Sequence, residues 1–258
     1  MNWQSLDLSI LGPAFIAGLL VLSTHVPLGR LVLKRGIIFI DLAVAQIAGI
    51  GVIAADQFGW DDSPWQVQIA AVSTAILGAL LLRWTEKRFA DIQEALIGVL
   101  FVLAATLSLL LLSSNPHGGE HLKDLLVGQI LWVSYEDLIT TTIIYSFLLF
   151  IWFGLKIGEK FPSAFYLVFA VAVTVSVQLV GVYLVFTSLI VPALVTRQLK
   201  GNRQLLTAFI LGAFSFAAGL TASALFDLPS GAVIVWSLAF FGILYSIIFS
   251  KKTPAEEK

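Results

Sequence analysis

The dominant feature of the sequence is a series of long apolar stretches separated by short polar gaps. A helix of roughly 20 residues, rising about 1.5 Å per residue, crosses a bilayer core of about 30 Å. The pattern predicts spanning helices at residues 9–31, 36–56, 65–83, 91–113, 135–155, 162–180, 182–197, 204–226 and 230–250. Because the stretch at 182–197 is short and contains Pro192, we expect eight or nine spans. Leu122–Val133 is apolar but too short to cross, and we expect a re-entrant or interfacial helix there.

The composition agrees with a membrane protein and excludes several other classes. Hydrophobic residues make up 59% of the 258 positions and charged residues 12%, and the mean hydropathy is +0.95. This leaves too little charge to cover a soluble domain. The net charge of -1 argues against a nucleic-acid partner, and the absence of cysteine excludes disulfides and thiolate metal sites. We therefore predict an all-α, polytopic integral membrane protein with one transmembrane domain over residues 1–258. We expect the first span to be retained, because Met1–Asp7 lacks the basic residues of a signal peptide.

Basic residues gather in alternate gaps between the predicted spans. By the positive-inside rule these gaps face the cytoplasm, which places the N-terminus outside and the C-terminus inside. The other gaps are poor in Lys and Arg, and Asp56–Pro64 holds three Asp. The basic gaps contain Arg30, Lys34, Arg35, Arg83, Lys87, Arg88, Lys156, Lys160, Arg197, Lys200, Arg203, Lys251 and Lys252.

Two carboxylates, Asp41 and Glu94, fall inside predicted spans, where an ionised side chain costs several kcal/mol. With His25 they lie at comparable depth, within about 6–12 Å of the cytoplasmic interface. Carboxylates with an imidazole are a plausible ligand set for a divalent transition metal, or a proton relay. The alternative for Asp41 and Glu94 is a helix-capping role favoured by the helix dipole. For His25 it is a packing role, with a bond to a carbonyl freed by Pro27.

A second polar cluster, His117, Glu120 and His121, lies in a gap expected outside the membrane. Two imidazoles and a carboxylate separated by glycines form a candidate site for external metal capture, with zinc as the natural cation. A solvated turn is the alternative.

Two further observations concern the energy source. The sequence contains no Walker A motif, so any energy from ATP must come from another chain. A helix interrupted by Pro192 leads into a basic turn with Arg197, Lys200 and Arg203, which suits a docking element on the cytoplasmic side. The same features also fit a kinked span with ordinary basic flanks.

Five motifs occur in an order that resembles the membrane subunit of bacterial metal-ion importers of the ATP-binding-cassette (ABC) class, the zinc, manganese and iron permease family. The resemblance covers roughly residues 10–250. The motifs are Arg35-Gly-Ile-Ile-Phe-Ile-Asp41, Glu94-Ala-Leu-Ile-Gly98, Leu125-Leu-Val-Gly-Gln-Ile-Leu-Trp-Val-Ser134, the segment Leu179–Pro192 and Asp227-Leu-Pro-Ser-Gly231.

The resemblance implies the compact helical fold of these importers, in a homodimer in the bacterial cytoplasmic membrane. A cytoplasmic ATPase subunit and an extracytoplasmic metal-binding protein would be its partners, with membrane lipid around it. Asp41 and Glu94 would line the metal pathway, and the stretch around Arg197 would dock the ATPase. The family usually has a histidine four residues after the aspartate, and here that position is Ala45. Gln46, His25 or the His117–His121 loop would have to compensate.

We therefore expect a divalent-metal permease with no permanently bound cofactor. Its imidazoles favour zinc over manganese or iron as the transported metal. One alternative is a proton- or ion-coupled secondary transporter, for which we find no inverted repeat in the sequence. A second alternative is a permease of the siderophore or cobalamin type.

Overall fold

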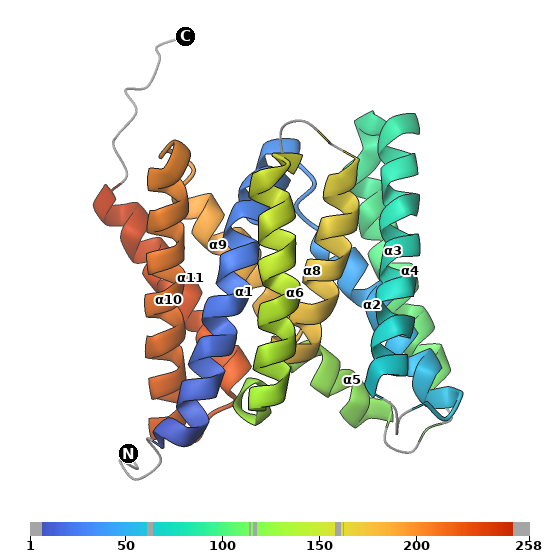
Figure 1. Ribbon diagram of the computed structural model, residues 1–258, viewed down its shortest axis with the longest axis horizontal. Helices are drawn as coiled ribbons and strands as arrows, with labels where there is room; N and C mark the ends of the chain where they lie inside the picture. The colour runs from blue at the N-terminus through green and yellow to red at the C-terminus, as the bar shows by residue number, and fades with distance from the viewer. Residues whose placement is uncertain are drawn as a thin grey trace.

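A computed structural model describes residues 7–60, 64–113, 115, 118–157, 161 and 163–249. The helices run mostly up and down between the two ends of a bundle (Figure 1). The α-helices are α1 (Leu8–Arg35), α2 (Ile40–Gln57), α3 (Pro64–Arg88), α4 (Gln93–Leu112), α5 (Gly118–Val127), α6 (Tyr135–Gly154), α8 (Ala164–Val180), α9 (Val182–Val195), α10 (Gly201–Phe226) and α11 (Ser230–Phe249). The 3-10 helices η2 (Ala90–Ile92) and η3 (Ile130–Trp132) precede α4 and α6.

The hydropathy pattern located each long helix. Among the described helices, 7 are long and apolar enough to cross a membrane, namely α1, α2, α3, α4, α6, α10 and α11. The remaining two predicted stretches form the apolar but shorter α8 and α9, of 17 and 14 residues. The all-α, multi-pass prediction is therefore confirmed, and α8 and α9 are shorter than the other seven apolar helices.

The turn between α8 and α9 is the single residue Gly181, and it packs on the turn that follows α5. Gly181 has φ 82° and Gly128 has φ 72°, in the left-handed region that only glycine adopts freely. A Cβ on Gly181 would overlap the amide nitrogen of Gly128, and a Cβ on Gly128 would overlap the carbonyl of Val180. The two turns therefore touch backbone to backbone.

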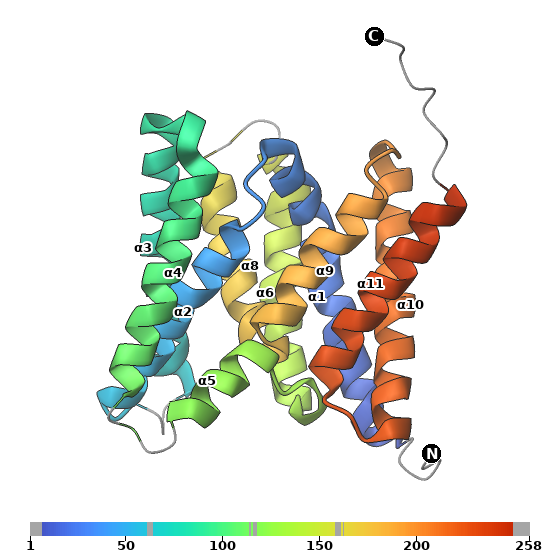
Figure 2. The same ribbon diagram turned by 180° about the vertical axis from the view of Figure 1, so that it is seen from behind.

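The helix α5 lies at one end of the bundle, beside the start of α9 (Figure 2). Its 10 residues rise only about 15 Å, so it is too short to cross a bilayer, as the sequence predicts. The start of α11 also reaches this region, because a Cβ on Gly231 would overlap the carbonyl oxygen of Val127 at the end of α5.

Charge divides the two ends of the bundle. At the end where α1, α3 and α6 finish, which we call the basic end, lie all described Lys and Arg residues except Lys123. The opposite, acidic end carries Asp7, Asp56, Glu120, Asp124, Glu136, Asp137 and Asp227. At the basic end, Arg35 ties α1 to two other helices: its guanidinium lies 3.7 Å from the Glu86 carboxylate of α3 and 4.6 Å from the centre of the Phe165 ring of α8.

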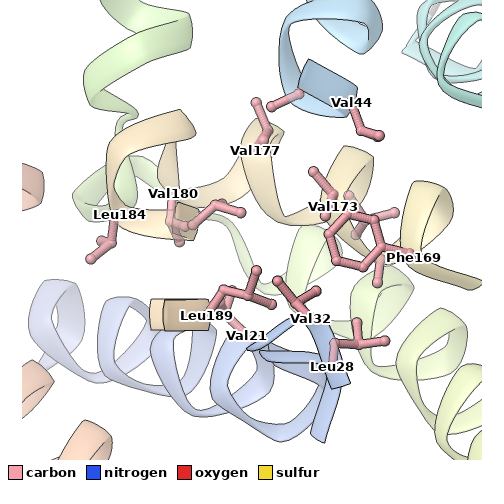
Figure 3. Packing of buried hydrophobic residues seen from close by; sticks show 14 of the residues in the cluster. Val21, Leu28, Val32, Val44, Phe169, Val173, Val177, Val180, Leu184 and Leu189 are labelled. Atoms are coloured by element: carbon pink, nitrogen blue, oxygen red, sulfur yellow. The ribbon is translucent and has the colours of Figure 1, made fainter. Parts of the chain in front are cut away.

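The helices differ in how far the rest of the bundle covers them. In its most apolar window, 61% of α2 is buried and 50% of α1, against 17% of α11. Figure 3 shows the packing at the centre, where α1, α2, α8 and α9 contribute Val21, Leu28, Val32, Val44, Phe169, Val173, Val177, Val180, Leu184 and Leu189. The outer helices present large apolar side chains such as Phe150 and Trp236, each 75% exposed, which suits contact with lipid tails. Asp41 and Gln46 of α2 therefore lie inside the bundle.

Candidate metal pathway

The carboxylate of Asp41 lies inside the bundle at the N-terminal end of α2. A turn through Gly36 (φ 70°) separates α1 from α2, and Asp41 falls in the first turn of α2, where the helix dipole favours a negative charge. Asp41 is only 1% exposed. Its Oδ1 accepts a hydrogen bond from the Leu42 amide at 2.8 Å, whereas its buried Oδ2 has no hydrogen-bond partner among the described residues. Asp41 therefore does not reach the surface, and one oxygen stays available to a ligand.

Glu94 brings a second carboxylate to the same helix end. It lies in the first turn of α4, and its Oε1 accepts a hydrogen bond from the Phe39 amide at 3.2 Å. Phe39 is the N-cap residue of α2, two residues before Asp41. The buried Oε2 of Glu94 also has no hydrogen-bond partner in the part of the chain that the structure describes. Both carboxylates thus meet the N-terminal end of α2, a proximity that their depth alone does not establish.

Gln46 lines a cavity of about 460 Å³ between α2, α4, α5, α9 and α11. Leu42, the residue after Asp41, lines the same cavity, so the cavity begins one residue from the buried carboxylate. Its other polar residues are Tyr183 and Thr187 of α9, and the rest of its wall is mostly apolar. Ala45 is 1% exposed and lies one helical turn beyond Asp41 on the same face of α2.

His25 belongs to a different part of the core. It is fully buried in α1, and its Nδ1 lies 2.9 Å from the Val21 carbonyl and 3.1 Å from the Thr24 hydroxyl. Its Nε2 has no hydrogen-bond partner among the described residues. The helix α1 packs mainly on α9, α10, α6 and α8 rather than on α2. The carbonyl that His25 contacts is that of Val21, not the Ser23 carbonyl that Pro27 frees.

The external cluster is only partly described. Glu120 lies exposed in the first turn of α5 at the acidic end, whereas His117 and the side chain of His121 lie outside the described residues. Within the described ranges, no group of three or more His, Asp and Glu side chains comes together around a common point. A second cavity, of about 330 Å³, opens nearby and is lined by Asp56, Asp124, Gln129 and Gln178.

The predicted docking element forms the turn between α9 and α10 at the basic end. Pro192 lies within α9, and the Thr196 hydroxyl after the helix donates to the Pro192 carbonyl at 2.7 Å. Arg197 donates from its guanidinium to the Leu194 carbonyl at 3.0 Å. Lys200 is the N-cap residue of α10, and Arg203 lies in its first turn. A cavity of about 340 Å³ separates this turn from the end of α11.

Comparison with known families decides the class of protein. The family model described as the ABC 3 transport family matches residues 7–157 and 154–250, which together are nearly the whole chain. This chain belongs to the ABC 3 transport family. It is a membrane permease subunit of a metal-ion ABC importer, and the ATPase of such an importer is a separate subunit.

Individual relatives of the permease span almost its full length. The manganese transport system membrane protein MntC of Halalkalibacterium halodurans is 30% identical over 266 residues, which cover 92% of this chain and 89% of that protein. The high-affinity zinc uptake system membrane protein ZnuB of Haemophilus influenzae is 24% identical over 255 residues, with coverage of 91% and 96%. The solved structure of PsaBC from Streptococcus pneumoniae in complex with Fab has a TM-score of 0.73 at 20% identity, covering 91% of this chain and 90% of that one.

These matches confirm the family resemblance and the permease fold. They place the permease in an importer complex with an ATPase and a binding protein. Tyr183 and Thr187 are cavity-lining residues that the sequence pattern does not single out. Both lie in the motif Leu179–Pro192. Because this segment is largely apolar, its pattern predicts a buried helix and does not mark the two hydroxyl groups.

Proposed function

We propose that this permease moves a divalent transition-metal cation past Asp41 and Glu94, between conformations driven by the separate ATPase. The observation that carries the proposal is the pair of carboxylates at the N-terminal end of α2, each with one buried oxygen left without a partner among the described residues. Buried unpaired carboxylates are expensive in a membrane protein and mark ion pathways. Two such oxygens form a site that binds a cation weakly enough to release it, and Gln46 lines the cavity that begins one residue from Asp41.

The route we propose runs from the acidic end to the basic end. The cavity with Asp56 and Asp124 is the entrance, with metal capture assisted by His117, Glu120 and His121. The cavity lined by Gln46 follows, and the two carboxylates come next. By the positive-inside rule the basic end faces the cytoplasm, which puts the N-terminus outside and the C-terminus inside the bacterial cytoplasmic membrane.

The choice of metal depends on which donors meet the cation. The imidazoles of the sequence favour zinc, and this is the prediction for His117 and His121. The carboxylate and amide oxygens at α2 suit manganese better than zinc. The imidazole of His25 contacts groups of its own helix. It is therefore weaker support for zinc than its predicted depth near Asp41 and Glu94 suggests. We therefore propose zinc and manganese as the two cations to compare directly.

The partners follow from the same assignment. We propose that two copies of the permease pair in the membrane and that the ATPase docks on Pro192, Arg197, Lys200 and Arg203. The apolar wall of the hollow between this turn and α11 includes Tyr245 and Phe249, which would receive a partner's side chains. The metal-binding protein would meet the acidic end.

Uptake of labelled zinc and manganese into proteoliposomes tests the proposal, with the permease, its ATPase and its binding protein reconstituted together. Asp41→Asn and Glu94→Gln are each expected to lower ATP-dependent uptake at least about tenfold. Replacing a residue that only supports a metal ligand already causes a loss of this size. Asp91→Asn is the matched control, because Asp91 is an exposed carboxylate three residues from Glu94, and it should retain uptake within about twofold.

Uptake that is indifferent to both carboxylates would reduce them to structural residues. Metal-independent transport of a chelate would favour the siderophore type of permease, and uptake that persists without the ATPase would favour a secondary transporter.

A further inference from the structure

A groove at the basic end lies on the outside of the bundle, away from the proposed metal route. The helices α6 and α10 both pack on α1 and make little or no contact with each other in the described part of the chain, and α1 lies between them (Figure 1). The resulting hollow, of about 320 Å³, has α1 as its floor. We call it the α1 groove, and the residues that matter in it are Arg30, Lys34, Trp152, Phe153, Lys156 and Leu205.

Two cations from α1 and one that follows α6 meet in the α1 groove, and the described residues of its wall include no acidic side chain. Arg30 and Lys34 come from the last turns of α1, and Lys156 follows the end of α6. All three are exposed. Glu86 is the carboxylate at this end that forms a salt bridge among the described residues. Its partner is Arg35, not Arg30, Lys34 or Lys156. The groove is therefore an anion-attracting site with its charge available.

The other walls of the groove are apolar and continue toward the middle of the bundle. Trp152 forms part of the wall and is 9% exposed, whereas Phe153 is 55% exposed. Phe150 on α6 lies two residues before Trp152 and Leu206 on α10 one residue after Leu205, and they are 75% and 62% exposed. A ligand that fills this groove must therefore combine an anionic group at the basic end with an apolar body that follows α6 and α10.

We propose that the α1 groove binds an anionic phospholipid from the leaflet at the basic end. The phosphate lies against Arg30, Lys34 and Lys156, and an acyl chain lies against Trp152, Phe153 and Leu205. Basic pockets between transmembrane helices bind lipid head groups in this way, with the long apolar stems of Lys and Arg along the lipid. The proposal rests on the membrane location of the chain and is independent of which metal it carries.

Native mass spectrometry of the delipidated, full-length permease in neutral detergent tests this site. Phosphatidylglycerol should bind at lower concentration than phosphatidylcholine. In Arg30→Gln/Lys34→Gln, affinity for phosphatidylglycerol should fall by about fivefold for each basic side chain removed, roughly 25-fold for the pair. Lys87→Gln/Arg88→Gln removes one Lys and one Arg from the end of α3 at the same end of the molecule and should leave the affinity within about twofold.

Equal binding of the two lipids, or equal loss in both double variants, would overturn the proposal. A second readout does not depend on the charge variants. Phosphatidylglycerol with brominated acyl chains should quench tryptophan fluorescence, and Trp152→Phe should lose part of that quenching. If inorganic phosphate at millimolar concentration displaces the lipid completely, the groove is an anion site without an acyl-chain site, and the lipid proposal fails.

Discussion

Asp41 and Glu94 share a pattern of bonding at the level of single atoms. Each carboxylate gives one oxygen to a backbone amide and keeps the other buried without a partner in the described residues. These hydrogen bonds from backbone amides orient each carboxylate, because a carboxylate with one oxygen hydrogen-bonded loses much of its rotational freedom. Both residues also accept hydrogen bonds at the start of α2, Asp41 from its own helix, as the helix-capping alternative predicts, and Glu94 from α4.

Sequence reasoning found both residues but not the contact between them and α2. Depth follows from counting residues along a helix, so the sequence locates Asp41 and Glu94 along the membrane normal. The hydrogen bond from the Phe39 amide to Glu94 depends on how α2 and α4 pack, which hydropathy does not encode. Tyr183 and Thr187 were missed for the same reason, because a cavity exists only once several helices meet.

The position of Ala45 gives a prediction about metal retention. A histidine there would stand one turn from Asp41 on the same face of α2, which restores the donor that the family usually has. Ala45→His should bind zinc at least about tenfold more tightly, as a further donor joins the carboxylate, and should slow its release. Isothermal titration calorimetry measures the affinity. Ala45→Leu is the control, because it adds similar bulk without a metal donor and costs roughly 1–3 kcal/mol of overpacking. An equal increase in zinc affinity in both variants would refute a ligand role for the histidine.

Helices and turns were predictable to different degrees. The apolar stretches matched the helices closely, because a membrane span must be long, apolar and helical to satisfy its backbone. The meeting of Gly128, Gly181 and Gly231 was not predictable, since the sequence marks each glycine only as a local break. The structure shows that three of the motifs that carry the family resemblance converge there. Their conformation and close packing explain why glycine occupies these positions.

The contact between the two turns can be tested with one methyl group. Gly181→Ala introduces a Cβ at φ 82° against the amide of Gly128. We expect the free energy of unfolding in detergent to fall by about 1–3 kcal/mol, from backbone strain and overlap, and ATP-driven uptake to slow as well. Gly154→Ala is the control, because Gly154 ends α6 and a methyl group there would have nothing within 4 Å of it; its stability should be unchanged or slightly higher. Equal stability of the two variants would refute the packing argument.

At the scale of the whole molecule, the separation of charge between the two ends predicts the orientation in the membrane. The chain has 0 cysteines, so single cysteines can be introduced without a background. In intact cells, Phe58→Cys at the acidic end should react with a membrane-impermeant maleimide, since Phe58 is 74% exposed. Lys87→Cys at the basic end should react only after the cells are opened. The reverse labelling pattern would place the N-terminus inside and overturn the proposed direction of transport.

The single-residue connection at Gly181 has a mechanical consequence for α9. This helix has 14 residues and is about 21 Å long at about 1.5 Å per residue. One end is wedged against the turn after α5, and the other leads into the basic turn at Arg197. The helix also packs along its length on α1 and α11, so we expect a push on the α9–α10 turn to move these helices together, with the smallest displacement at the glycine contact. In such a movement α9 would act as a lever whose fulcrum is the glycine contact, and it would displace the wall of the cavity that Tyr183 and Thr187 line.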